Sequence, residues 1–341
     1  MFPSPLQALR DERNILLLFG LVILVYYVMM DIILWRTILD TSLAHQKPSK
    51  DGLFSPFSPL SMKLLMSDPT SHYIIAPTTE YFDKITNFST VFYFITPNMI
   101  SFTHLFLAFV SGKFVASENL HTRRIGVVLY QFRTWLDGLD GVVFRSRSSK
   151  KMYHSIRKTT GYYVDTLSDV AGGFCLMFGV LFYLFKYFDA KYSHETLPHW
   201  TKNGEATKPM LTNGHSLMPK PSRKYLFWKC WCFGFMLGAS SVIWDSVVDN
   251  LKNIFEVPLE DPSLTIIQTD ALHSGSTFVV CWLWRLLEGQ SLLQVILIVI
   301  WVDKVWVCPA LFIQSVLHFF FFFFFFFYHI LCYIFFKKKK E

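Results

Sequence analysis

Four aspartates in the middle of the chain have the residue type and spacing of a divalent-metal site. Asp137 and Asp140 are three residues apart, and Asp165 and Asp169 are four residues apart. On a helix, either spacing places both side chains on one face. Because neighbouring carboxylates repel one another, such a group favours divalent cations, and hard oxygen ligands suit Mg²⁺ or Mn²⁺. Two such ions can hold the attacking and leaving oxygens of a phosphoryl transfer.

Residues at regular offsets from the aspartates also fit phosphate chemistry. Gly141 follows Asp140 directly, and Gly161 lies four residues before Asp165. A missing Cβ lets a ligand approach the backbone closely, and Arg145 offers parallel N–H donors to a phosphate. The alternative is that the acids are solvated helix ends without a function. Two acid pairs accompanied by glycine and arginine favour a site.

Apolar stretches on both sides of the aspartates indicate a membrane protein. The chain is 52% hydrophobic and 17% charged, whereas soluble domains carry about 25% charged residues. Several windows reach the roughly 20 apolar residues that a bilayer span needs, among them residues 15–35, 125–144 and 161–188. Ionisable groups beside such helices are costly and indicate function. We therefore predict an all-α fold, a polytopic transmembrane helix bundle of roughly seven spans, with close helix packing at Gly172 and Gly173.

The hydropathy pattern divides the chain into four parts. Residues 1–35 are an N-terminal tail and a signal-anchor span, whose apolar segment is too long for a cleaved signal peptide. Residues 36–95 are a polar loop, expected in the lumen, with at most one short helix. Residues 96–307 form the membrane domain that carries the aspartates. Residues 308–341 are an anomalous, Phe-rich tail, interpreted either as a final span or, as we favour, as an artefact without function.

The combined motif resembles the signature of the CDP-alcohol phosphotransferase family. It reads Asp137-x-x-Asp140-Gly141-x-x-x-Arg145, followed by Gly161-x-x-x-Asp165-x-x-x-Asp169. Two features depart from the family pattern: Phe144 stands where alanine is usual, and residues 146–160 form a longer spacer. This basic spacer and the sequence GYYVDTLSD that follows it resemble one branch, the insect-type ceramide phosphoethanolamine synthases. The resemblance covers most of the chain.

The resemblance implies an enzyme that transfers phosphoethanolamine from CDP-ethanolamine to the primary hydroxyl of ceramide, with CMP as the second product. Two ions, Mn²⁺ or Mg²⁺, would be held by Asp137, Asp140, Asp165 and Asp169. Asp169 would also be the general base. The residues implied to face the nucleotide are Asn98, Gly141, Arg145 and Gly161. The branch further implies a multi-pass Golgi membrane protein with a lumenal active site, and it allows a homodimer.

Other functions stay open. The signature residues do not separate ceramide from diacylglycerol, so an ethanolamine- or choline-phosphotransferase acting on diacylglycerol is the nearest alternative. A transporter would show polar residues along several helices, whereas here they cluster at one depth, and an inactive scaffold would not need all four acids. We find no aromatic and basic module for nucleic acid. The expected partners are therefore CDP-ethanolamine, ceramide and the lipid bilayer, without nucleic acid.

Charge gives conflicting indications of topology. Residues 145–160 carry six basic and no acidic residues, which the positive-inside rule would keep in the cytosol. With a cytosolic N-terminus, however, three spans bring Asp137 and Asp140 to the lumenal side. We adopt the lumenal site, because a basic loop with a catalytic role can violate the rule. Asn87 begins a glycosylation sequon, and Asp31 is expected at the membrane interface without a catalytic role.

Overall fold

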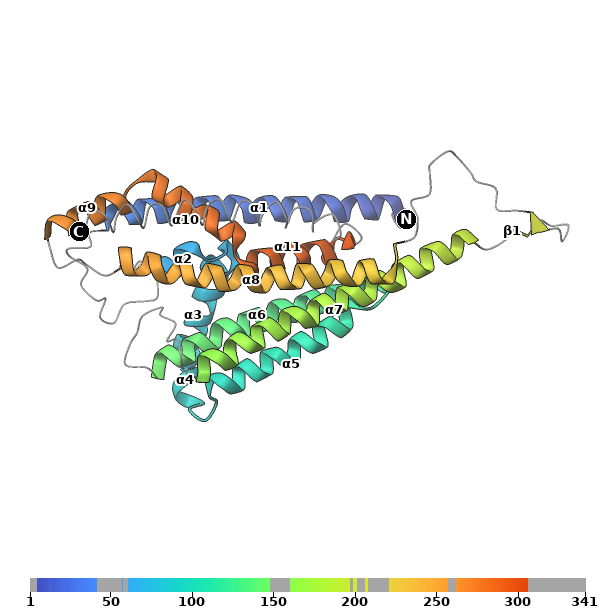
Figure 1. The fold of residues 1–341 in the computed structure, drawn as a ribbon, viewed down its shortest axis with the longest axis horizontal. Coiled ribbons are helices and arrows are strands. Elements are labelled where there is room, and N and C mark those ends of the chain that lie inside the picture. The colour runs from blue at the N-terminus through green and yellow to red at the C-terminus, as the bar shows by residue number, and fades with distance from the viewer. Residues whose placement is uncertain are drawn as a thin grey trace. The chain divides into compact units, whose positions relative to one another are not determined.

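The computed structural model describes residues 5–41, 57, 61–147, 160–196, 199–200, 206–207, 221–256 and 262–305. The described part of the chain is built almost entirely of helices, which confirms the predicted all-α fold (Figure 1). Its strands are limited to one antiparallel pair of two residues each, β1 (His199–Trp200) and β2 (Ala206–Thr207).

The described residues form two compact units. The first takes its residues from Met1–Phe88 and Asp245–Leu286, and the second from Ser89–Ser149, Ser155–Trp244 and Leu287–Glu341. These units are defined by spatial contacts, and their bounds differ from those of the four parts predicted from hydropathy. The division into four parts stays a prediction. Each unit is described by itself.

The first unit contains the N-terminal helix and several short helices. Its elements are α1 (Pro5–Asp40), α2 (Met62–Met66), the π-helical η2 (Ser71–Ile75), α3 (Ala76–Thr86), the C-terminal part of α8 (Arg223–Phe255), α9 (Pro262–Leu272) and α10 (Gly275–Leu287). Residues 61–91 are therefore more helical than the polar loop we expected. Helix α3 ends at Asn87, whose φ of 50° is left-handed. Asparagine adopts this conformation more readily than most residues with a side chain.

A buried ion pair joins distant segments of the first unit. Arg285 is 1% exposed, and its Nη1 donates to Asp31 Oδ1 at 2.5 Å, while its Nε donates to the Leu65 carbonyl at 2.6 Å. Tyr73 donates its hydroxyl to Asp31 Oδ1 at 2.5 Å, and Trp282 donates Nε1 to Oδ2 at 2.9 Å. Because both charges have further hydrogen bonds, their burial is compensated. Asp31 thus ties α1 to α10, a structural role that its position near the end of a span did not indicate.

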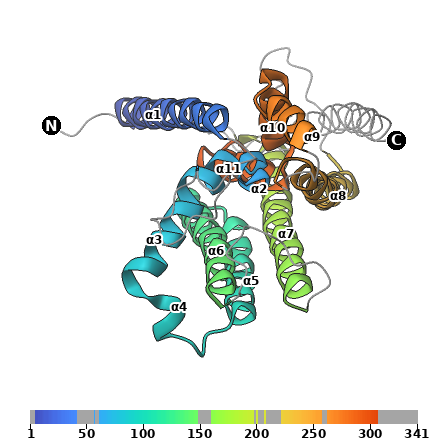
Figure 2. The same ribbon diagram turned by 90° about the vertical axis from the view of Figure 1, so that its left-hand side faces the viewer.

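The second unit holds three long helices that pack together. Its elements are α5 (Pro97–Val115), α6 (Leu120–Arg147), α7 (Thr160–Thr196), the N-terminal part of α8 and α11 (Gly289–Trp301), with α4 (Phe88–Val91) at the division between the units. Helix α5 packs against both α6 and α7 (Figures 1 and 2). It begins as its sequence suggests, because Thr96 caps it by accepting the N–H of Met99 at 3.3 Å and Pro97 occupies the first turn.

The close contact between α5 and α7 requires glycine. A Cβ at Gly112 would lie 2.4 Å from the Cys175 carbonyl oxygen, and one at Gly179 would lie 2.4 Å from the Gly112 carbonyl oxygen. The backbones of the two helices therefore approach directly, as small residues allow in membrane proteins. Of the glycines that we expected here, Gly172 lies against Arg133 and a Cβ at Gly173 would meet nothing within 4 Å. The expectation for Gly173 was wrong among the described residues, because the position of its Cβ is open space.

Four helices of the described part are long and apolar enough to cross a membrane. They are Asn14–Asp40, Pro97–Val115, Thr160–Lys191 and Arg223–Phe255, and α10 with α11 forms a fifth if the two are counted as one bent span. Helix α6 was also expected to span; it has 28 residues, but its charged side chains lower its hydropathy. The described residues thus show fewer apolar spans than the roughly seven expected, and the tail at 308–341 lies outside them.

Candidate metal and active site

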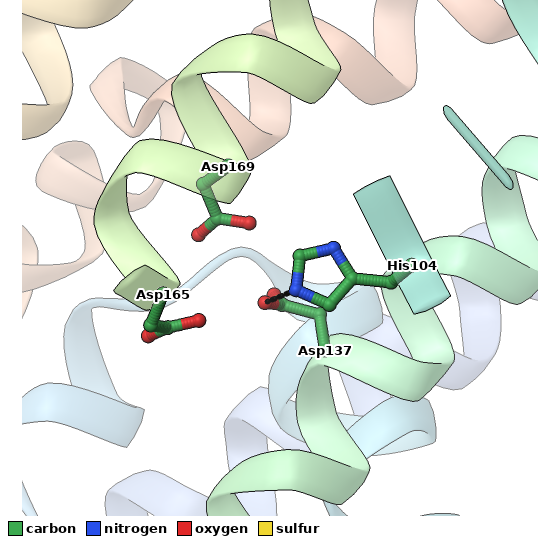
Figure 3. A group of neighbouring side chains, drawn as sticks. All are labelled: His104, Asp137, Asp165 and Asp169. Carbon is green, nitrogen blue, oxygen red and sulfur yellow. Dashed lines mark ion pairs between the residues drawn. The ribbon is translucent and has the colours of Figure 1, made fainter. Parts of the chain in front are cut away.

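The structure brings the aspartates of the sequence motif together within the second unit. Asp137 and Asp140 lie in the C-terminal half of α6, and Asp165 and Asp169 lie in the first turns of α7. Both helices pack on α5, which contributes His104 to the same space. Figure 3 shows the carboxylates of Asp137, Asp165 and Asp169 around the His104 imidazole. The spacing argument from the sequence therefore holds for the position of each pair on its helix.

One subset of these side chains has the dimensions of a metal site. One ligand atom from each of His104, Asp137, Asp165 and Asp169 lies within 4.8 Å of the other three. Ligands about 2.1 Å from an ion lie up to roughly 4 Å from one another, so small side-chain adjustments would close the set around a cation. Three carboxylates also concentrate negative charge, which a divalent cation would neutralise. The donor set therefore fits such an ion.

Asp140 lies beside this group rather than in it. Its side chain is buried, and its Oδ2 accepts a hydrogen bond of 2.8 Å from the hydroxyl of Ser101, one turn before His104 on α5. The Nε2 atom of His104 is 3.8 Å from the same oxygen. The structure thus places Asp140 next to the other aspartates, with one oxygen already engaged, and its predicted role as a metal ligand stays a prediction.

Neither His104 nor Arg133 was singled out from the sequence. Arg133 is 1% exposed, and its Nη2 forms an ion pair with Oδ1 of Asp169, whose side chain is 43% exposed. A Cβ at Gly172 would lie 3.3 Å from the Nε and Nη2 atoms of Arg133, so this glycine leaves room for the guanidinium. Arg133 precedes Asp137 by one helical turn in an apolar segment, and an arginine in such a segment was the signal available in the sequence.

The four residues expected to face the nucleotide form two pairs, and the two members of each pair lie close to each other. A Cβ at Gly161 would be 3.6 Å from the Asn98 side-chain oxygen, and a Cβ at Gly141 would be 3.1 Å from Nη1 of Arg145. The first pair joins the start of α7 to the start of α5, and the second lies on the last turns of α6. A side chain at Gly141 would displace the Arg145 guanidinium. Their contacts with a nucleotide stay predictions.

The fold and the site define a helical membrane protein with a carboxylate-rich group between neighbouring helices that could hold a metal ion. A family model described as ceramide phosphoethanolamine synthase matches residues 51–334, and the chain belongs to this family. A relative from Drosophila melanogaster, named ceramide phosphoethanolamine synthase, is 34% identical over 252 residues. This match covers 74% of the present chain and 62% of the relative, so the chain spans less than two thirds of that protein's length. No solved structure matches the chain.

Proposed function

We propose that the chain is a ceramide phosphoethanolamine synthase of the CDP-alcohol phosphotransferase type. It would transfer phosphoethanolamine from CDP-ethanolamine to the primary hydroxyl of ceramide and release CMP. Membership of the family supports the acceptor and the product. The observation that carries the chemistry is the convergence of Asp137, Asp165 and Asp169, each with a carboxylate oxygen in one group that could hold a metal ion.

Asp137, Asp140, Asp165 and Asp169 would hold two ions, Mn²⁺ or Mg²⁺. Ions bound there would neutralise the negative charge on the pyrophosphate and on the phosphoryl group that is transferred. Charged donors from the chain act on the same groups. Arg145, beside Gly141 at the end of α6, would donate to the transferring phosphate, and Asn98 and Gly161 would contact the nucleotide.

Asp169 would act as the general base. Its ion pair with Arg133 engages Oδ1, while the partly exposed side chain leaves Oδ2 available to a hydroxyl. Asp169 takes the proton of the ceramide primary alcohol as that oxygen attacks the β-phosphorus of CDP-ethanolamine. The bond from this phosphorus to the bridging oxygen of the pyrophosphate breaks, and the oxygen leaves with CMP. Arg133 is a positioning residue in this scheme.

We place the enzyme in the Golgi membrane as a multi-pass protein, with the active site in the lumen. The apolar helices α1, α5, α7 and α8 support the multi-pass membrane protein. The support for the compartment is the resemblance to the sphingolipid branch, which implies a lumenal Golgi site.

The test is a transfer assay on membranes from cells that express the chain. Labelled CDP-ethanolamine and Mn²⁺ are supplied with either ceramide or diacylglycerol, and membranes carrying Asp137→Asn correct for host enzymes. Labelled ceramide phosphoethanolamine above that control is the expected result. Product from diacylglycerol alone would keep the phosphotransfer chemistry and overturn the acceptor and the compartment. An absence of product with both acceptors would contradict the proposed function.

A further inference from the structure

His104 is a buried histidine whose ring nitrogens have no hydrogen-bond partner in the described part of the chain. Its side chain is 0% exposed, and both Nδ1 and Nε2 are inaccessible to solvent. The Nε2 atom lies 3.7 Å from Asp137 Oδ1 and 3.8 Å from Asp140 Oδ2. Both distances exceed those of protein hydrogen bonds. Because buried polar groups are nearly always satisfied, a buried imidazole without a partner calls for a ligand.

Two of the carboxylates near His104 are engaged by other groups. Asp140 accepts the Ser101 hydroxyl at 2.8 Å, and Asp169 is paired with Arg133. A histidine that served only to neutralise these acids would be expected at hydrogen-bond distance from one of them. The separations of 3.7 and 3.8 Å instead leave space between the imidazole and the nearest carboxylate oxygens.

Donor atoms from three helices lie close together here. A His104 nitrogen and one oxygen each from Asp137, Asp165 and Asp169 all lie within 4.8 Å of one another, and Figure 3 shows the ring facing the acids. An imidazole nitrogen with a free lone pair binds first-row transition metals, whereas Mg²⁺ prefers oxygen ligands alone. The group therefore offers one nitrogen and three oxygens to an ion such as Mn²⁺.

We propose that His104 is a nitrogen ligand of the divalent ion held by Asp137, Asp165 and Asp169. The inference rests on the proposed function, since that function requires a metal at these aspartates, and it adds a ligand from α5 to a set otherwise drawn from α6 and α7. Asp140, oriented by Ser101, would then serve the second ion. The imidazole also ties the metal to the helix that carries Asn98.

The experiment is pulsed electron paramagnetic resonance on the purified full chain in lipid nanodiscs with bound Mn²⁺. A directly coordinated imidazole modulates the Mn²⁺ echo through its ¹⁴N nucleus, and the signal is independent of turnover. We expect this modulation in the wild type and in the control variant His121→Asn, because His121 is exposed at the start of α6. We expect its loss in His104→Gln, together with at least a tenfold weaker Mn²⁺ affinity.

The outcomes separate this inference from the proposed function. Bound Mn²⁺ without nitrogen modulation in the wild type would overturn the role of His104 and leave the carboxylate site intact. A wild-type chain that binds no Mn²⁺ would overturn both. If His104→Gln does not fold, wild-type protein labelled with ¹⁵N-histidine tests whether a histidine nitrogen coordinates Mn²⁺. Its echo modulation must change to that of ¹⁵N, and an unchanged echo would refute histidine coordination.

Discussion

The pairing of Arg133 with Asp169 links the stability of the site to its chemistry. Arg133 is almost fully buried, and Asp169 is the acidic partner that the structure gives it. A buried charge left without its partner typically costs about 3–5 kcal/mol of folding free energy. Any substitution of Asp169 therefore removes the proposed base and destabilises the fold at the same time, and an experiment must separate the two effects.

We expect Asp169→Asn to abolish phosphoethanolamine transfer while retaining part of the nucleotide affinity. The amide cannot take the proton of the acceptor hydroxyl, whereas Asn98, Gly141 and Arg145 are unchanged. Transfer is measured with labelled CDP-ethanolamine, and nucleotide binding with labelled CMP at equilibrium. The melting temperature of the variant should also fall, because Arg133 loses its partner.

The double variant Arg133→Gln with Asp169→Asn is the matched control. It removes both charges of the pair, so much of the lost melting temperature should return. Transfer should stay absent, because the carboxylate is still missing. Turnover near the wild-type rate in Asp169→Asn would refute the general-base assignment.

At the scale of elements, the glycine contact between α5 and α7 sets the relative position of their side chains. Gly112 and Gly179 allow the two backbones to touch, and Ser111, next to Gly112, donates its hydroxyl to the Gly126 carbonyl of α6 at 2.8 Å. His104 lies about two turns before this contact on α5. A shift of α5 relative to α7 would therefore move His104 away from Asp165 and Asp169.

We expect Gly112→Ala to lower both the melting temperature and the rate of transfer. Its Cβ would lie 2.4 Å from a backbone oxygen of α7, which no side-chain rotation can relieve. Overpacking of this kind costs typically about 1–3 kcal/mol. Thermal unfolding in detergent and the transfer assay measure the two effects.

Gly173→Ala on α7 is the comparison for that variant. Its Cβ meets nothing within 4 Å, and alanine favours a helix over glycine by up to about 1 kcal/mol. Its melting temperature should stay the same or rise. Equal losses in Gly112→Ala and Gly173→Ala would contradict the packing explanation.

At the scale of the whole molecule, the orientation of the chain decides which compartment the site faces. The aspartates lie where α6 ends and α7 begins, on either side of the basic residues 145–160. If α1, α5 and α6 each cross the bilayer and the N-terminus is cytosolic, this end of the helices is lumenal. The same orientation places the segment before α5, including Asn87, in the lumen.

We expect Asn87 to carry an N-linked glycan. Its side chain is exposed at the end of α3, and only lumenal sequons receive glycans. Endoglycosidase treatment should increase the gel mobility of the wild type and leave Asn87→Gln unchanged. A sequon introduced between residues 208 and 220 should stay unmodified. Glycosylation at that introduced sequon, with none at Asn87, would reverse the topology and place the site in the cytosol.

The sequence by itself determined the class of fold and the acidic motif. Apolar length and composition predicted an all-α membrane bundle, and the intervals between Asp137 and Asp140 and between Asp165 and Asp169 predicted two acid pairs on helices. Both are local properties, because span length and helical periodicity depend on neighbouring residues alone. The family resemblance came from the same short-range motif.

Tertiary structure alone decided which side chains meet. His104 and Arg133 lie outside the aspartate motif, yet packing of α5, α6 and α7 places them among the aspartates. Asp169 lies 36 residues from Arg133, and Asp31 lies 254 residues from its partner Arg285. A helical period says which face a residue occupies but not which helix that face will meet. That choice depends on backbone contacts such as the one between Gly112 and Cys175, which exist only in the packed structure.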